Sequence, residues 1–215
     1  MDGVFVTGTG TEVGKTVVAA LIAHTARPDG LSVSVFKPAV SGLDENGVPD
    51  HEQLRLASGS AQTDDEISPY RYGPAVSPHL AAAMAGESID AERLREALGA
   101  ARAAGEFLVC EGVGGFLVPL RLDYLVRDFA RDAGLPVVIV GAPGLGTINH
   151  TLLTVESVRG AGLEIAAVVL NRWPAAPSPL EESNLDAIRS FGAVEVRTVA
   201  EVDPLDPESW PALTL

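Results

Sequence analysis

The residues with the clearest chemistry form a glycine-rich loop, Gly8-Thr-Gly-Thr-Glu-Val-Gly14-Lys15-Thr16, which follows a short apolar run. Glycines let successive backbone N–H groups turn inward without Cβ clashes, and a helix that begins there adds its free N–H groups and positive dipole end. The loop therefore predicts a nucleotide phosphate site, with Lys15 on the phosphates and Thr16 on Mg²⁺. The alternative is a glycine-rich turn with an incidental lysine, since five residues rather than the usual four separate the outer glycines.

Lysine usage points to a second residue of the same site. The chain has thirteen arginines but only two lysines, Lys15 and Lys37, and Lys37 ends the next apolar run. Arginine is a planar, permanently charged fork, whereas lysine is a flexible point charge whose pKa responds to its surroundings. We therefore expect both lysines to serve one site that handles phosphate. The alternative for Lys37 is an exposed lysine at the end of a strand.

The composition excludes several classes of partner. The net charge is −14 and the basic residues form no block, so we expect no nucleic-acid partner. The apolar runs are too short to span a bilayer and the N-terminus lacks the basic segment of a signal peptide, so we expect a cytoplasmic protein without membrane contact. Cys110 is the single cysteine, and its apolar neighbours predict a small core residue.

Short β-branched runs alternate with alanine-rich stretches, and continuous apolar runs are typical of strands covered on both faces. We expect strands at Val4–Thr7, Val33–Phe36, Phe107–Cys110, Val137–Val140, Ile165–Leu170 and Val194–Arg197. We expect helices at Gly14–Ala26, Ala91–Ala104, Leu122–Ala133, Thr147–Arg159 and Pro179–Phe191. The alternation predicts an α/β fold in one domain, residues 1–215, with three layers and a mostly parallel central sheet flanked by helices.

Three stretches interrupt this rhythm. Ser41–Tyr72 is polar and turn-rich, Trp173–Pro179 is predicted to be an exposed loop, and residues 202–215 are expected to be loosely packed. Asp90 is a predicted N-cap. The predicted helix stops are Gly105, Gly134 and Gly192.

Four motifs in order make the functional prediction specific. They are Thr7-Gly-Thr-Gly-Thr-Glu-Val-Gly-Lys-Thr16, Lys37-Pro-Ala-Val-Ser-Gly42, Glu111-Gly-Val-Gly-Gly115 and Leu145-Gly-Thr-Ile-Asn-His150. Together they closely resemble dethiobiotin synthetase, from residue 3 to about residue 171. The resemblance implies a P-loop NTPase fold and a homodimer with active sites at the subunit interface.

The same resemblance implies a reaction of biotin biosynthesis. The substrates would be 7,8-diaminopelargonate, CO₂ (as bicarbonate in solution) and ATP with Mg²⁺. One amine would form a carbamate, which would attack the γ-phosphate to give a carbamic–phosphoric anhydride. The second amine would then close the ring of dethiobiotin and expel phosphate.

Catalytic roles follow from the matched positions. The resemblance makes Thr11, Lys15 and Lys37 catalytic, with Lys15 offsetting charge on the transferred phosphoryl group. Lys37 would lower the repulsion between the carbamate and the γ-phosphate. Thr11, Lys37 and Ser41 would contact the diamine or its carbamate. The diamine's carboxylate would meet a helix start from the neighbouring subunit, at Gly146, Thr147, Ile148 and Asn149; the alternative there is plain helix capping by Thr147.

Further residues match the family's nucleotide and metal positions. The nucleotide would contact Glu12, Val13, Gly14, Lys15, Thr16, Val17, Asp50, Glu111, Gly112, Val113, Gly114, Asn171 and Arg172. Thr16, Asp50 and Glu111 would give oxygen ligands to Mg²⁺, which favours such ligands. The loop before Asp50 differs in length from the family's, so Asp44 or Glu52 are alternatives for that ligand.

The base pocket departs from the family pattern. Asn171 matches an adenine-reading asparagine, but Arg172 stands where better-studied members have an aspartate. The stretch that completes the pocket is present only as Val199-Ala-Glu-Val202. We therefore expect this enzyme to tolerate other nucleoside triphosphates.

Two other functions remain as alternatives. One is a dimeric P-loop switch ATPase of the partition or division-site type, which acts through protein partners. Such proteins typically carry an additional lysine near the start of the loop, and no lysine lies between Gly8 and Gly14. The other is an amidotransferase synthetase of related fold, for which Cys110 is a poor candidate nucleophile.

Overall fold

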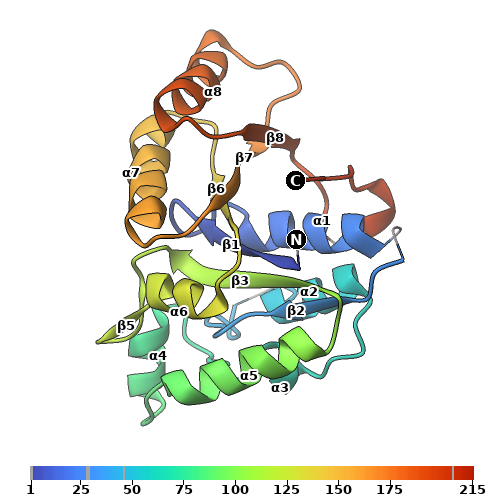
Figure 1. Ribbon diagram of the computed structural model, residues 1–215, viewed down its shortest axis with the longest axis vertical. Helices are drawn as coiled ribbons and strands as arrows, with labels where there is room; N and C mark the ends of the chain where they lie inside the picture. Colours follow the sequence, from blue (N-terminus) through green and yellow to red (C-terminus); the bar gives the residue numbers. More distant parts are fainter. Residues whose placement is uncertain (1, 28–29, 46, 205) are drawn as a thin grey trace.

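A six-stranded sheet forms the centre of the computed structural model, which describes residues 2–27, 30–45, 47–204 and 206–215 (Figure 1). The strands lie in the order β2-β3-β1-β6-β7-β8, and every neighbouring pair is parallel. Their bounds are Gly3–Gly8 (β1), Val33–Phe36 (β2), Phe107–Gly115 (β3), Val137–Gly141 (β6), Ile165–Trp173 (β7) and Val196–Ala200 (β8). Because parallel strands end at the same edge, the segments after β1, β2 and β3 meet there.

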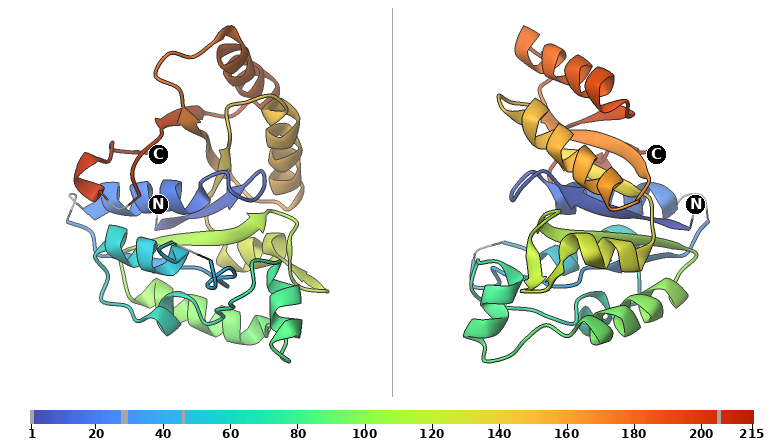
Figure 2. Two further views of the ribbon diagram at one scale, coloured as in Figure 1. Left: turned by 180° about the vertical axis from the view of Figure 1, so that it is seen from behind. Right: turned by 60° about the vertical axis from the view of Figure 1, so that its left-hand side comes forward.

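Helices cover both faces of the sheet (Figure 1, Figure 2). One face packs against α1 (Lys15–Ala26) and α2 (Asp50–Ser58). The opposite face packs against α4 (Pro78–Met84), α5 (Ala91–Ala103), α6 (Val126–Ala133), α7 (Thr147–Gly160) and α8 (Pro179–Gly192). The three-layer α/β fold predicted from the sequence is therefore confirmed.

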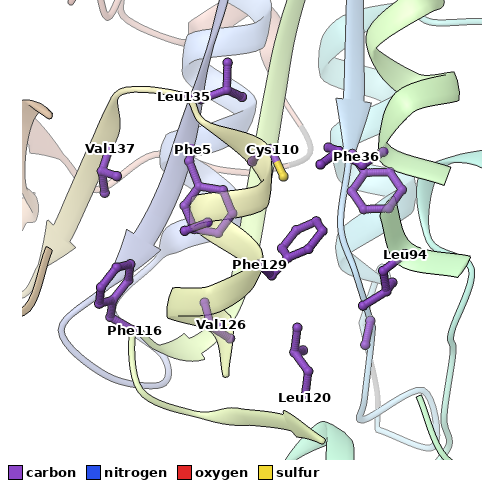
Figure 3. Packing of buried hydrophobic residues seen from close by; sticks show 14 of the residues in the cluster. Phe5, Phe36, Leu94, Cys110, Phe116, Leu120, Val126, Phe129, Leu135 and Val137 are labelled. Atoms are coloured by element: carbon purple, nitrogen blue, oxygen red, sulfur yellow. The ribbon is translucent and has the colours of Figure 1, made fainter. Parts of the chain in front are cut away.

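Alternation along β1 explains its continuous apolar run. Val4 and Val6 pack with α1, whereas Phe5 faces the opposite layer, because successive strand side chains point to opposite faces. Figure 3 shows Phe5, Phe36 and Phe129 together in that layer. The ring centroid of Phe129 lies 6.0 Å from that of Phe5 and 5.8 Å from that of Phe36. These rings join α6 to β1 and β2 in one core.

Cys110 lies in the same core and is fully buried, as predicted (Figure 3). Burial raises the pKa of its thiol far above the ordinary value. Since the thiolate is the nucleophilic form, this side chain is chemically inert at neutral pH. The amidotransferase alternative therefore has no nucleophile at Cys110.

The prediction of a helix from Leu122 to Ala133 is wrong in its first four residues. They belong to a short antiparallel hairpin, β4 (Pro119–Arg121) and β5 (Tyr124–Leu125), and α6 begins only at Val126. Leu122 is 86% exposed at the turn, while Tyr124 is buried. The Asp128 carboxylate accepts from the backbone N–H of Leu125 at 2.9 Å and fixes the later start.

Other boundaries differ in smaller ways. The last strand is β8 at Val196–Ala200 rather than Val194–Arg197. Gly192 is the last residue of α8 rather than the residue that follows it. The C-cap is Ala193, which has the left-handed φ of 44°. Asp90 caps α5 as predicted, since its Oδ1 accepts from the N–H of Glu92 at 2.9 Å.

The turn-rich stretch contains more helix than its composition indicates. It holds α2 and the short α3 (Asp64–Ile67), which starts at a capping box between Thr63 and Glu66. In the C-terminal stretch a 3₁₀ turn covers Pro207–Ser209, and Trp210 and Leu213 are buried against the α1 layer. The loose packing predicted for residues 202–215 stays a prediction. Among the described residues, no helix has the length and apolarity that crossing a membrane requires.

Candidate functional site

A cavity of about 500 Å³ opens at the carboxyl ends of β1, β2 and β3. Most of the predicted site residues line it: Thr11, Glu12, Gly14, Lys15, Thr16, Lys37, Ser41, Asp50, Glu111, Val113, Gly114 and Arg172. They come from five separate stretches of the chain, and the parallel sheet brings them to one edge. The cavity lies where open α/β sheets bind ligands.

The glycine-rich loop runs from β1 directly into α1. Gly14 is the N-cap of α1 and has φ 88°, a left-handed conformation that favours glycine. The Lys15 ammonium donates to the carbonyl oxygen of Gly10 at 3.0 Å, so the lysine folds back over its own loop. Burial lowers the pKa of Lys15, and the Glu111 carboxylate offsets part of that effect. The loop thus presents a buried cation and a helix start to the same space.

Lys37 follows β2 by one residue and is almost wholly buried, with 2% of its surface exposed. Its Nζ lies 2.7 Å from Oε1 of Glu111 and 2.9 Å from Oδ2 of Asp50. The same Nζ lies 3.4 Å from the carbonyl oxygen of Gly112. Burial alone would lower the pKa of Lys37, but the Asp50 and Glu111 carboxylates outweigh it and raise the pKa well above its usual range.

The two carboxylates differ in their own environments. Glu111 lies within β3 and is fully buried, and burial raises its pKa despite the nearby Lys37 ammonium. Asp50 is the first residue of α2 and is partly exposed. Burial would raise the pKa of Asp50, but the Lys37 charge and hydrogen bond lower it. The Lys37 ammonium therefore contacts both carboxylates, but its effect on the pKa outweighs burial only at Asp50.

The predicted metal ligands fit a hard cation such as Mg²⁺. The Thr16 hydroxyl donates to Oε1 of Glu111 at 2.9 Å, and Oε2 of Glu111 is buried without a hydrogen-bond partner among the residues that the structure describes. Such an oxygen retains its full capacity to accept a cation or donor. Asp50 lines the cavity, whereas the Asp44 carboxylate lies against Gly73. Within the described ranges, no three His, Cys, Asp or Glu side chains form a metal cluster, so the fit rests on two acids and a hydroxyl.

Several predicted residues lie outside this cavity. The Asn171 side chain is buried, and its Nδ2 donates to the carbonyl oxygen of Val13 at 3.1 Å. Thr147 lines a separate cavity of about 280 Å³ on the other side of the loop, with Thr9, Gly10 and Thr11 among its walls. The remaining predicted residues without a place in the main cavity are Val13, Val17, Gly112, Gly146, Ile148 and Asn149.

The start of α7 is not capped by Thr147. Its N-cap is Gly146, with φ 92° and no side-chain cap, so the capping alternative for Thr147 is wrong. The loop before α7 is instead held by Asn184 of α8, whose Nδ2 donates to the carbonyl oxygens of Pro143 and Gly144 at 2.9 and 3.2 Å. Asn184 is buried and was missed by sequence reasoning, because a single asparagine in an amphipathic helix carries no motif.

Comparison with known proteins gives consistent matches. A family model described as AAA domain matches residues 2–212. The ATP-dependent dethiobiotin synthetase of Aromatoleum aromaticum is 43% identical over 189 residues, covering 86% of this chain and 84% of that protein. The enzyme of the same name from Anaeromyxobacter dehalogenans is 40% identical over 210 residues, covering 98% and 91%. That from Bacillus subtilis is 35% identical and covers 91% and 85%.

Solved structures share the fold at lower identity. The septum site-determining protein MinD from Pyrococcus horikoshii, complexed with Mg-ADP, has a TM-score of 0.53 at 16% identity and covers 96% of this chain and 83% of that one. The cell division ATPase MinD from Pyrococcus furiosus also has a TM-score of 0.53, at 18% identity, covering 97% and 86%. At such identities the likeness concerns the fold alone.

Proposed function

This chain belongs to the AAA-domain family and, within it, to the ATP-dependent dethiobiotin synthetases, and we propose that it makes dethiobiotin from 7,8-diaminopelargonate, CO₂ and ATP. It is an ATP-dependent ligase of biotin biosynthesis. One observation supports the proposed chemistry above all others. A phosphate-loop lysine, Lys15, and a second buried lysine, Lys37, face the same cavity.

The reaction needs a cation that can contact both the carbamate and the γ-phosphate, because these two anions must approach each other. The first amine attacks CO₂, forms a carbon–nitrogen bond and loses a proton, which gives a carbamate. A carbamate oxygen then attacks the γ-phosphorus and ADP leaves with the electron pair of the broken bond. The ammonium of Lys37 lowers the repulsion between carbamate and phosphate, and Thr11 and Ser41 hydrogen-bond the diamine or its carbamate. In the last step the second amine attacks the carbonyl carbon of the resulting carbamic–phosphoric anhydride, loses a proton and expels phosphate, which closes the ring.

Nucleotide and metal would be held by neighbouring groups. Backbone N–H groups of the loop and the Lys15 ammonium bind the triphosphate, because the helix start and the lysine both favour anions. Thr16, Asp50 and Glu111 would hold Mg²⁺, consistent with the unpartnered Oε2 of Glu111. When bound, Mg²⁺ neutralises charge on the phosphate oxygens. Lys15 offsets the charge that remains on the transferred group.

The diamine's carboxylate would bind at the start of α7 in a second copy of the chain. Gly146 and Thr147 lie outside the main cavity, so one copy alone does not bring them to Lys37. Large apolar side chains are exposed on this side, with Leu145 90%, Leu153 58% and Leu117 54% exposed. An exposed apolar patch of this kind favours a protein interface. We therefore propose a cytoplasmic homodimer with interfacial active sites.

The switch ATPase is the weaker alternative. Its support is the fold shared with division ATPases at 16–18% identity, whereas dethiobiotin synthetases match at 35–43% over most of the chain. The loop also lacks the additional lysine that such switches typically carry.

A product assay tests the proposal. The protein is incubated with 7,8-diaminopelargonate, ¹³C-bicarbonate, Mg²⁺ and ATP, and the products are separated by mass. We expect labelled dethiobiotin and phosphate in equal amounts, with phosphate release dependent on the diamine. Phosphate release without the diamine, and no ring product with it, would support the switch ATPase instead.

A further inference from the structure

The end of β7 carries an irregularity that faces the phosphate loop. Asn171 pairs with Val199 of β8 and Trp173 pairs with Ala200. Arg172 between them has no paired residue in β8 and forms a β-bulge. Arg172 has φ 58°, which is uncommon for a residue with a side chain. Bulges beside active sites often re-aim a side chain. Here the bulge turns Arg172 toward the cavity, which it lines.

Two adjacent side chains of β7 hold two adjacent carbonyl groups of the loop. Nη1 of Arg172 donates to the carbonyl oxygen of Glu12 at 3.2 Å. Nδ2 of Asn171 donates to the carbonyl oxygen of Val13 at 3.1 Å. These contacts join segments about 160 residues apart in the sequence. With both carbonyls engaged by β7, the peptide units of the loop are fixed in orientation.

The loop itself is strained at the point where Arg172 holds it. Glu12 has φ 59°, a left-handed conformation in a residue that is not glycine. Such residues persist only where their surroundings fix them. Close packing fixes the next turn as well, because a Cβ on Gly14 would lie 1.9 Å from Nδ2 of Asn171. Both ends of the Glu12–Gly14 segment are therefore held by β7.

We propose that Arg172 and Asn171 are positioning residues which hold the phosphate loop in its anion-binding form from the end of β7. They act through the loop's carbonyl groups, and the loop's N–H groups meet the phosphates. This inference rests on the proposed nucleotide site. It assigns Arg172 a role that is independent of the base, since its partner is the backbone of Glu12.

Arg172→Gly is the sharpest test variant. Glycine adopts positive φ readily, so the bulge keeps its shape while the guanidinium is lost. Arg159→Ala is a matched control, because Arg159 also donates to a carbonyl of a left-handed residue, Ala193, at 3.0 Å but at the far end of α7. Affinities for ATP and for tripolyphosphate, a probe without a base, are measured by calorimetry at low and high salt.

We expect Arg172→Gly to weaken ATP and tripolyphosphate alike by roughly tenfold, as expected for loss of one charge-assisted hydrogen bond. The loss of affinity should persist at about 0.5 M salt. Salt screens the attraction between a distant charge and the phosphates, but it does not restore a missing hydrogen bond that positions the loop. Arg159→Ala should bind both probes like the wild type.

Other outcomes would overturn the proposal. Unchanged affinities in Arg172→Gly would show that the loop does not need the Arg172 hydrogen bond to bind phosphates. A loss for ATP without a loss for tripolyphosphate would make Arg172 a base contact, and a loss that vanishes at high salt would make it a distant cation only. If the wild-type chain bound neither probe, the proposed nucleotide site itself would be wrong, and with it the positioning role of Arg172 and Asn171.

Discussion

Lys15 and Lys37 share one cavity but lie in opposite electrostatic surroundings. Lys15 donates to a neutral carbonyl, and burial lowers its pKa. Lys37 lies between the carboxylates of Asp50 and Glu111, and its pKa is raised. The Lys15 ammonium is therefore available to an incoming anion, whereas the charge of Lys37 is already paired with the carboxylates of Asp50 and Glu111.

The difference separates two tasks. A lysine that lacks a balancing carboxylate gains the most from a polyanionic ligand, which suits Lys15 to the nucleotide phosphates. A lysine held by two acids is fixed in position before any ligand arrives, which suits Lys37 to the reacting carbamate. Lys15 resembles the lysine of many phosphate loops, so we propose that Lys37 and its neighbours specify the reaction.

The largest effect is expected from Lys37→Gln on product formation. Loss of the ammonium leaves the carbamate and the γ-phosphate to repel each other, so the rate of dethiobiotin formation should fall about 10²–10³-fold or more. Single-turnover measurements with saturating ATP and diamine check this. A fully active Lys37→Gln variant would remove the distinction between the two lysines.

Stability should also distinguish the two positions. Lys37→Met leaves the buried Glu111 carboxylate without its cation, so the free energy of unfolding should fall by about 3 kcal/mol at neutral pH. Lys15→Met removes a buried charge that donates to the carbonyl oxygen of Gly10 and whose burial outweighs the effect of the nearby carboxylates, so it should be neutral or stabilising. Urea unfolding of both variants gives the comparison. Equal destabilisation by the two substitutions would show that the two lysines do not differ in their electrostatic surroundings.

The pH dependence of ATP affinity reports on Lys15. Burial places the pKa of Lys15 below 10.5 in the free protein, and bound phosphates favour its charged form. ATP affinity should therefore be highest below the pKa of Lys15 and fall as the pH rises through it, in the alkaline range below 10.5. The sign for folding is opposite, because a lowered lysine pKa makes stability rise with pH in that window. Calorimetric titrations from neutral to alkaline pH, with Lys15→Met as the control, test this; a flat profile in the wild type would contradict it.

The smallest effect is expected from exchanging the nucleotide base. Arg172 holds the loop backbone and Asn171 is buried, so we expect the phosphates rather than the base to carry most of the binding. Affinities for CTP and ATP should agree within about threefold, under 1 kcal/mol. Competition binding measures the ratio. About a hundredfold preference for ATP would show that a base pocket exists after all.

The sequence predicted the part of the site whose residues belong to continuous motifs. The loop from Gly8 to Thr16, Lys37 and Glu111 each sit at the end of an apolar run, so their convergence follows from parallel strands ending at one edge. The resemblance assigned Gly146–Asn149 to a neighbouring copy's site, but no motif predicted their own placement, which is outside the main cavity of this chain. That depends on how α7 leaves the sheet, and a single buried asparagine, Asn184, holds the loop there.

The errors in the fold have a similar cause. The hairpin at residues 119–125 is too short to show strand alternation, and its exposed Leu122 completes a helical pattern by chance. The bulge at Arg172 is likewise invisible in the sequence, because it comes from the register between β7 and β8. Short-range patterns predict the elements, whereas long-range packing decides where they end.

The ATP affinity of the Lys37→Gln variant tests the separation of the two lysines most directly. We expect its dissociation constant for Mg-ATP, measured by calorimetry on protein shown to be folded, to stay within about threefold of the wild type. A loss of affinity as large as that of Lys15→Met would contradict the separate roles and make Lys37 a second nucleotide ligand.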